Sequence, residues 1–422
     1  MKIKLTNIKQ SILVVYIFLL TVFGYSVLSM RKYLLAGGII LAMLIVLSNK
    51  KIRLRKIGGN TKIWALMCGV ACAATVLADI FPTIYSSANI GLGEYIDVLK
   101  EFVLLPLVIY FFSRHTNIEA YILFFRGYAL VLCLLCLIEK TMSTKLFLWL
   151  YSPLPSSAEV ERVSLFLSHP IYFAVFVMLG AIALMMYPLK NTLRTVIAWI
   201  LIFVGLFFSE ARSTWVAFVM VAILRYLKKK KVKRSVKKSK LVAFTALVLC
   251  FLVILLSTDI IQNAFMQIFG KISVIWDSDS NDASKGIRLT NAINAIVFLG
   301  SNPRYLLIGG GYGFSLSFLL ENPSLYGWTD ALDNQYLSYI LNFGILTFAL
   351  FIILTCRCLK SVFVKNEIST EYFTLNLMLI SLMISLFFFE ALTTISPVFA
   401  VYISLIFLID VCENRPNHQE VL

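Results

Sequence analysis

Charged residues are scarce in this sequence: 14% of its 422 residues are Asp, Glu, Lys or Arg, whereas 60% are hydrophobic. A soluble fold of this length could not bury so much apolar surface, and the mean hydropathy of +0.87 is typical of a membrane protein. The net charge of +16 does not indicate nucleic-acid binding, because Lys and Arg stand in short clusters between apolar runs, like cytoplasmic loops that face anionic lipid. The sequence therefore predicts an all-α polytopic membrane protein without a nucleic-acid partner.

Metal and redox motifs are also absent. Cys133 and Cys136 form a CxxC pair, but neither a His nor a second Cys pair accompanies it in a soluble segment, and most of the eight cysteines lie inside apolar runs. Residues 277–282 open like a calcium loop, yet Asp282 stands where Gly is required and Arg288 where the loop needs Glu. We interpret the cysteines as buried hydrophobes and the acidic stretch as a linker, and we expect neither a metal nor a cofactor.

Long apolar runs dominate the remainder of the chain. A spanning helix needs about 20 apolar residues, or somewhat fewer among packed neighbours. No clear cleavage site follows the first run, so it is interpreted as a membrane helix and not as a signal peptide. By this measure twelve helices are predicted, near 11–30, 33–48, 63–81, 98–113, 118–138, 169–187, 194–209, 213–227, 241–257, 335–355, 373–390 and 395–412.

The distribution of Lys and Arg orients these helices. Basic clusters recur in alternate loops, most densely at 50–56 and 228–240, which predicts that both termini are cytoplasmic; a basic pair at 31–32 is the main exception. Two outer segments are then long enough to fold on the membrane surface, 139–168 and 257–334, and the second has seven acids against four bases. The chain is accordingly divided into helices over 1–256, a large extracytoplasmic loop over 257–334, and helices with a short tail over 335–422.

The large loop contains two recognisable pieces. Leu289, Ile293 and Ile296 recur at helical spacing while Asn291 falls on the opposite side, so 285–299 is predicted to be an amphipathic helix at the membrane interface. Three consecutive glycines follow at 309–311, but no strand–helix context surrounds them. We interpret them as a structural turn and not as a nucleotide-binding loop.

Several charged residues stand at the outer helix ends, where an ionisable group needs a partner or a substrate. The short hairpin at 208–215 holds Arg212 at the interface, where it could bind phosphate or pair with Glu210. Arg288 begins the amphipathic helix and is either a second phosphate ligand or a solvated charge. Asp333 precedes the tenth helix and could act as a base, as the N-cap, or as both. His169, which precedes a proline, is interpreted as a helix-start residue.

The order of these motifs along the chain resembles the bacterial O-antigen ligase and polymerase superfamily, and is most similar to a Wzy-type O-antigen polymerase. The resemblance covers most of the chain. It rests on the helix count, the hairpin at 209–213, the stretch at 162–170, Arg288, the glycine turn at 307–314, and residues 333–337 with Gly344 beyond them.

The resemblance implies a metal-independent glycosyltransferase with a helical fold of the GT-C type and an undecaprenyl-diphosphate-linked sugar as donor. In such an enzyme Arg212 and Arg288 would bind the diphosphate and stabilise the departing charge, and Asp333 would be the general base. Membrane lipids, a chain-length regulator and a flippase are the other partners implied. The remaining substrate-binding positions implied are Arg162, Glu210, Asn334 and Tyr336.

Two alternatives to polymerisation stay open. Related O-antigen ligases, which transfer finished polymer to the lipid A core, place a His where this chain has Asp333, and this difference favours the polymerase. A flippase or other transporter is a twelve-helix alternative, but no internal repeat is evident and the charges gather at the outer edge instead of the midplane.

Overall fold

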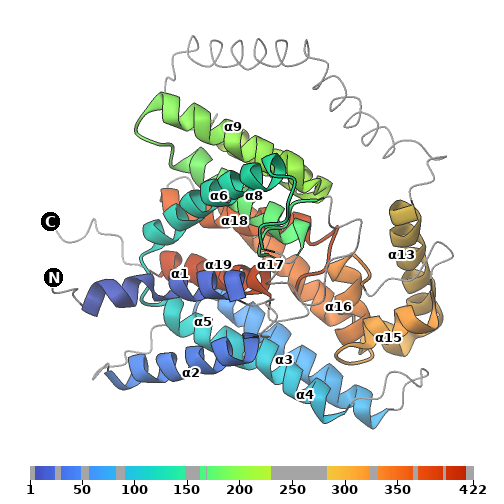
Figure 1. The fold of residues 1–422 in the computed structure, drawn as a ribbon. Helices are drawn as coiled ribbons and strands as arrows, with labels where there is room; N and C mark the ends of the chain where they lie inside the picture. Colours follow the sequence, from blue (N-terminus) through green and yellow to red (C-terminus); the bar gives the residue numbers. More distant parts are fainter. Residues whose placement is uncertain are drawn as a thin grey trace.

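The computed structural model describes residues 5–23, 30–48, 57–81, 91–147, 162–167, 169–229, 283–323, 331–364, 369–392 and 396–414 (Figure 1). These parts of the chain are helical and contain no strand. The helices are α1 (Leu5–Phe23), α2 (Arg31–Ser48), α3 (Gly59–Ile80), α4 (Leu92–Val98), η2 (Leu99–Leu104), α5 (Leu105–Ser113), α6 (Ile118–Thr141), α8 (Pro170–Met186), α9 (Thr192–Ser209), α10 (Arg212–Lys229), α13 (Ala283–Ser301), α14 (Pro303–Leu307), α15 (Phe314–Glu321), α16 (Gln335–Phe343), α17 (Ile345–Val364), α18 (Thr370–Ser385) and α19 (Pro397–Glu413).

Helix starts follow signals that are visible in the sequence. Asn117, His169, Asn191, Ser369 and Ser396 are N-caps whose side chains accept a hydrogen bond from a backbone N–H of the first turn. Such caps satisfy donors that have no partner inside the helix. The interpretation of His169 as a helix-start residue is thus confirmed.

Three helices form the centre of the bundle. Nearly every residue of α8, α18 and α19 is buried, and most of these buried residues are apolar, which is typical of helices enclosed by other helices. Helices at the periphery, such as α2, α3 and α9, instead leave large apolar side chains exposed, including Leu47, Leu66 and Phe203. Such an exposed apolar surface requires an apolar solvent, as lipid provides.

Four helices are long and apolar enough to span a bilayer by length and composition: Gly59–Ile80, Ile118–Thr141, Thr192–Ser209 and Ile345–Phe363. Shorter apolar helices accompany them at Gln10–Phe23, Pro170–Met186 and Thr370–Ser385. The protein is therefore an all-α polytopic membrane protein. Twelve spans remain a prediction, and the helix predicted at 241–257 lies outside the described residues.

The prediction of one helix over 335–355 is wrong. Gly344 has a φ of 79° and ends α16, and α17 starts at the next residue. A Cβ at position 344 would lie 2.3 Å from the carbonyl oxygen of Leu307, so the chain needs glycine there both for its conformation and for its close contact with Leu307. Helix α17 is long and apolar enough to cross a membrane, and α16 precedes it as a separate short helix.

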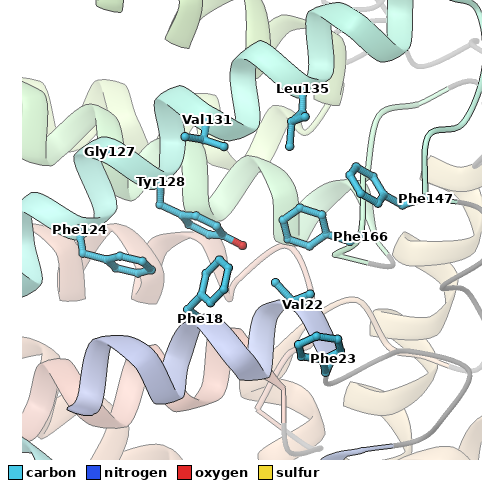
Figure 2. A pocket seen from close by; sticks show the side chains of 10 residues that line it. All are labelled: Phe18, Val22, Phe23, Phe124, Gly127, Tyr128, Val131, Leu135, Phe147 and Phe166. Carbon is cyan, nitrogen blue, oxygen red and sulfur yellow. The ribbon is translucent and has the colours of Figure 1, made fainter. Parts of the chain in front are cut away.

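An apolar groove lies between α1 and α6 (Figure 2). Its volume is about 660 Å³. Phe18 and Val22 of α1 face Phe124, Tyr128 and other residues of α6 across it, and Phe147 and Phe166 close one end. The groove thus reaches from the helix bundle into the outer segment predicted at 139–168.

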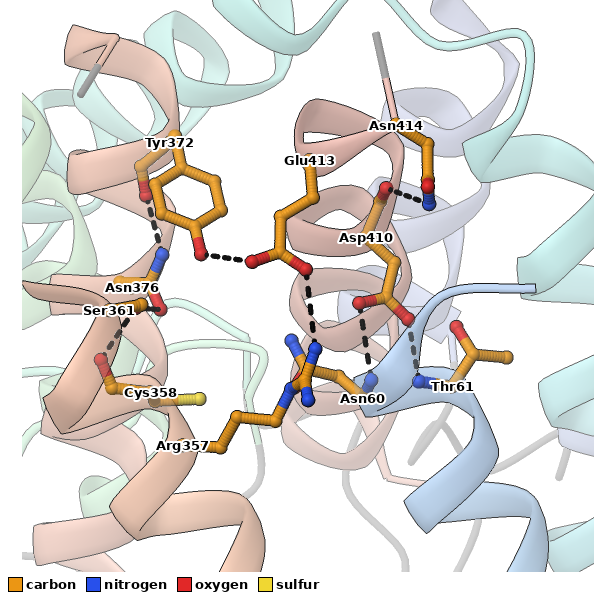
Figure 3. Close-up of polar contacts among 10 residues, drawn as sticks. All are labelled: Asn60, Thr61, Arg357, Cys358, Ser361, Tyr372, Asn376, Asp410, Glu413 and Asn414. Carbon is orange, nitrogen blue, oxygen red and sulfur yellow. Dashed lines mark hydrogen bonds and ion pairs between the residues drawn. The ribbon is translucent and has the colours of Figure 1, made fainter. Parts of the chain in front are cut away.

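A polar cluster joins α3, α17, α18 and α19 at the other end of the bundle (Figure 3). The Asp410 carboxylate accepts hydrogen bonds from the backbone N–H of Asn60 at 3.2 Å and of Thr61 at 2.6 Å. Glu413 accepts a hydrogen bond from the Tyr372 hydroxyl at 2.7 Å and lies 3.5 Å from the Arg357 guanidinium. By the predicted topology this cluster lies at the cytoplasmic end, where it ties the C-terminal helices to α3.

Candidate functional site

Arg288 and Asp333, which are 45 residues apart in the sequence, form an ion pair. The Nε of Arg288 on α13 donates to Oδ2 of Asp333 at 2.8 Å. The two side chains are 47% and 28% exposed, so the pair is accessible from outside the protein. Asp333 has a φ of 54°, a left-handed conformation that Asp tolerates better than most residues and that is common at functional sites.

The residues after Asp333 hold it in place. The N-cap of α16 is Asn334, whose Oδ1 accepts from the N–H of Tyr336 and of Leu337, so the expectation that Asp333 itself could cap this helix is wrong. The Gln335 Oε1 accepts from two backbone N–H groups at 391 and 392, at 2.8 and 2.6 Å. The carboxyl of Asp333 is therefore left for other contacts, on a backbone that is fixed from both sides.

Tyr336 has a mainly structural place. Its hydroxyl donates to the carbonyl oxygen of Met383 at 2.8 Å, and its ring packs against Phe351 and Phe387. This contact anchors the start of α16 to the end of α18. In the structure Tyr336 and Asn334 fix the start of α16 next to Asp333, and the substrate-binding role that the resemblance implied for them stays a prediction.

The α9–α10 hairpin positions the other predicted residues. Glu210 ends α9 in a left-handed conformation, with a φ of 54°, and its side chain is exposed. Arg212 begins α10 and is half-buried, and the described residues give its guanidinium neither a hydrogen bond nor an ion pair. Arg162 donates from Nε and Nη2 to the carbonyl oxygen of Ser209, at 3.1 and 3.0 Å. Arg162 therefore braces the hairpin that carries Arg212.

A further basic residue, Lys145, joins this hairpin. Its Nζ donates to the carbonyl oxygen of Arg162 and lies 3.4 Å from a carboxylate oxygen of Glu139. Burial lowers the pKa of the Lys145 ammonium, and the neighbouring Glu139 carboxylate opposes that shift. We call Lys145, Arg162, Ser209 and Arg212 the hairpin cluster.

The hairpin cluster and the Arg288–Asp333 pair are both connected to α18. Helix α10, which begins at Arg212, packs along α18. The segment that follows α18 donates a backbone hydrogen bond to Gln335, two residues after Asp333. By the predicted topology α10 starts, and α18 ends, at the outer face. Within the described part of the chain, however, no hydrogen bond or ion pair links Arg212 to Arg288 or Asp333, so their joint action remains a prediction.

Helix α13 covers the range that the sequence predicts, but a different face of the helix is buried. Asn291, expected on the polar side, is buried together with Ala295 and Leu299. Leu289 and Ile293 are exposed instead. The helix thus packs on the protein through Asn291, Ala295 and Leu299, and turns Leu289 and Ile293 outward, as an interfacial helix would.

The glycine turn is structural, as predicted. Gly309 and Gly311 have φ angles of 84° and 88°, and the N–H groups of Gly310 and Gly311 donate to the carbonyl oxygens of Leu341 and Asn342, each at 2.8 Å. A Cβ at position 309 would lie 2.4 Å from the Asn342 carbonyl oxygen. The turn needs glycine because it packs backbone to backbone against the end of α16.

One buried carboxyl was missed from the sequence. Glu101 lies in the π-helical segment η2, is 4% exposed, and accepts a hydrogen bond from the Tyr312 hydroxyl of the glycine turn at 2.8 Å. A signal was present, because an acidic residue inside an apolar helix marks a place that needs a partner. Glu101 connects the glycine turn to the helix bundle. The acidic stretch at 277–282 lies outside the described residues.

The fold and these residues define a polytopic helical membrane protein with two arginine-bearing groups, which the predicted topology puts at the outer end of its bundle. Residues 196–352, which include Arg212, Arg288 and Asp333, match the family model described as O-antigen ligase. This match over part of the chain supports a relation to the O-antigen ligase and polymerase superfamily, whose members are membrane glycosyltransferase-like enzymes. No curated protein matches the chain.

Proposed function

We propose that this protein is a surface-polysaccharide polymerase. It joins undecaprenyl-diphosphate-linked repeat units on the periplasmic face of the inner membrane, with both termini in the cytoplasm. The observation that carries the proposal is the contact between Arg288 and Asp333, because it joins a candidate phosphate ligand to a candidate base within the family-matched segment.

The arginines bind and stabilise the donor diphosphate. Asp333 engages only the Nε of Arg288, and no described residue bonds the two terminal nitrogens, which leaves a planar pair of donors for phosphate oxygens. Arg212 supplies a second permanent positive charge. As the bond from the sugar to the diphosphate breaks, negative charge grows on the leaving group, and preorganised cations stabilise it.

Asp333 takes the proton of the acceptor hydroxyl. The acceptor oxygen forms a bond to the donor sugar's anomeric carbon, the bond from that carbon to the phosphate oxygen breaks, and the electron pair leaves with the diphosphate. The Asp at this position, where related ligases place a His, is the reason for preferring polymerase over ligase. In this proposal the loop at 257–334 carries the chemistry together with the hairpin of the preceding helices.

The test uses arginine variants in a strain that lacks the native gene. Arg212→Ala and Arg288→Ala are compared with Arg194→Ala, an exposed arginine at the start of α9 and thus at the opposite end of the bundle. Removing one stabilising donor typically costs about 10²–10³ in rate. Both site variants should therefore lose the polymer ladder on a lipopolysaccharide gel, while Arg194→Ala keeps it and immunoblots show equal protein in the membrane.

The gel also separates the two family activities. A polymerase defect leaves single-repeat material attached to the core, whereas a ligase defect removes all capped core. Unchanged ladders in both site variants, at normal protein levels, would remove the assignment of these arginines.

A further inference from the structure

The groove between α1 and α6 offers almost no polar surface. It is lined by aromatic and aliphatic side chains and by the bare backbone of Gly127 (Figure 2). Its one hydroxyl-bearing residue is Tyr128, and that hydroxyl donates to the Thr21 hydroxyl at 2.8 Å, which in turn bonds the backbone of α1. With this hydroxyl satisfied inside the protein, the groove suits a purely apolar occupant.

The groove has the length of one membrane leaflet. From Phe124 to Leu135, its lining residues on α6 cover eleven helical steps, or about 17 Å at 1.5 Å per residue. Half of a hydrocarbon core of about 30 Å is roughly 15 Å. These residues occupy the middle of α6, and Phe147 and Phe166 continue the groove towards the end of α6 that lies outside in the predicted topology.

The outer end of the groove meets the hairpin cluster. Phe147, which follows Lys145 by two residues, and Phe166, which follows Arg162 by four, pack against each other with ring centroids 5.2 Å apart. The Lys140 ammonium lies over the Phe208 ring of the hairpin, 5.5 Å from its centroid. The apolar groove therefore ends beside positively charged side chains.

We propose that this groove holds the isoprenoid chain of the lipid-linked diphosphate substrate, with the diphosphate at the hairpin cluster. The inference rests on the proposed function and adds a binding site for the lipid part of its substrate. A single groove accommodates one chain, whereas a phospholipid carries two, and the cations at its end complement a diphosphate.

Packing, and not transfer from water, must supply the selectivity, because the chain is surrounded by apolar groups in the bilayer as well as in the groove. Each carbon–carbon contact contributes little, so the number of contacts matters. Filling the groove should therefore weaken binding of a long chain and leave the chemistry intact.

Gly127 allows the groove to be filled without a clash. A Cβ at this position meets nothing within 4 Å, and the same holds at the exposed Gly69 on α3, which provides a matched control. Donors with a long and with a short isoprenoid chain are assayed with the parent protein, Gly127→Phe and Gly69→Phe. We expect Gly127→Phe to raise the KM for the long-chain donor about tenfold, the effect of losing about ten carbon contacts, with the short-chain KM and both kcat values unchanged.

Photolabelling provides a readout that does not depend on catalysis. Protein in phosphatidylglycerol vesicles is labelled with a photoreactive long-chain isoprenoid diphosphate, and the labelled peptides are located by mass spectrometry. Labelling should fall on α6 and be diluted by unlabelled isoprenoid diphosphate, but not by additional phosphatidylglycerol.

The outcomes distinguish the two proposals. Inactivity of the parent protein with both donors, alongside specific labelling of α6, would overturn the polymerase and keep the groove site. Activity with equal KM values for the two Gly→Phe variants, or labelling that phosphatidylglycerol dilutes equally well, would overturn the groove site and assign it to ordinary membrane lipid.

Discussion

Replacement of Asp410 tests what holds the C-terminal helices to α3. The N-cap residue of α3 is Gly58, which has no side chain to satisfy the first N–H groups, and Asp410 from α19 supplies the acceptors instead (Figure 3). Asp410 is 3% exposed, so water does not easily replace it. Two hydrogen bonds to a charged acceptor are worth about 1.5–3 kcal/mol each, while a helix cap is worth about 1 kcal/mol. We expect Asp410→Ala to lower the free energy of unfolding by about 3 kcal/mol.

The measurement is SDS-induced unfolding in mixed micelles, followed by tryptophan fluorescence. Asp410→Asn keeps one acceptor oxygen, so it should lose roughly half as much as the alanine variant. Glu371→Ala, which removes a half-buried carboxylate from the first turn of α18, should stay within about 0.5 kcal/mol of the parent. If Asp410→Ala and Glu371→Ala have the same free energy of unfolding, the proposed capping between helices does not stabilise the fold.

Three further changes test the outer loop. Gly309→Ala places a Cβ 2.4 Å from a carbonyl oxygen and also has an unfavourable φ, whereas Gly313→Ala, with a φ of 79°, has only the unfavourable φ. SDS unfolding should therefore show that the free energy of unfolding falls by about 1–2 kcal/mol for Gly313→Ala and by more for Gly309→Ala. Equal losses would contradict the close contact. Tyr312→Phe leaves the buried carboxyl on η2 without its donor and should cost about 1–3 kcal/mol in the same assay, and a neutral result would show that this hydrogen bond is not needed. Asp333→Asn tolerates the left-handed backbone and removes only the charge. Because its partner Arg288 is half-exposed, the free energy of unfolding should change by less than about 1 kcal/mol, while polymer formation falls about 10²-fold or more. Normal polymer would exclude Asp333 as the base.

Much of the fold could be predicted from the sequence because membrane helices are recognisable by their apolar composition. Apolar length located the helices, and the caps at residues such as His169 and Ser396 are local features that need no tertiary information. The break at Gly344 was missed because an apolar run continues across it, and the need for glycine arises only from the contact with Leu307. A pattern of hydrophobicity does not record such a close approach of two backbones.

The candidate site was predictable in its chemistry but not in its pairing. Arg212, Arg288 and Asp333 were identifiable because charged residues at outer helix ends are costly without a role. Their partners depend on distant residues: Arg288 finds Asp333, and Arg162 finds the carbonyl of Ser209. The sequence also could not tell which face of α13 packs, because Asn291 is buried against expectation.

The sequence by itself determined that this is a polytopic helical membrane protein, and its motifs indicated the superfamily, because hydrophobic length and residue type are local properties of the chain. The tertiary structure decided which groups meet. It placed Asp410 on the first turn of α3, Tyr312 on the carboxyl of Glu101, and an apolar groove beside the hairpin cluster. These contacts depend on how helices far apart in the chain pack together, and no local pattern of residues contains that information.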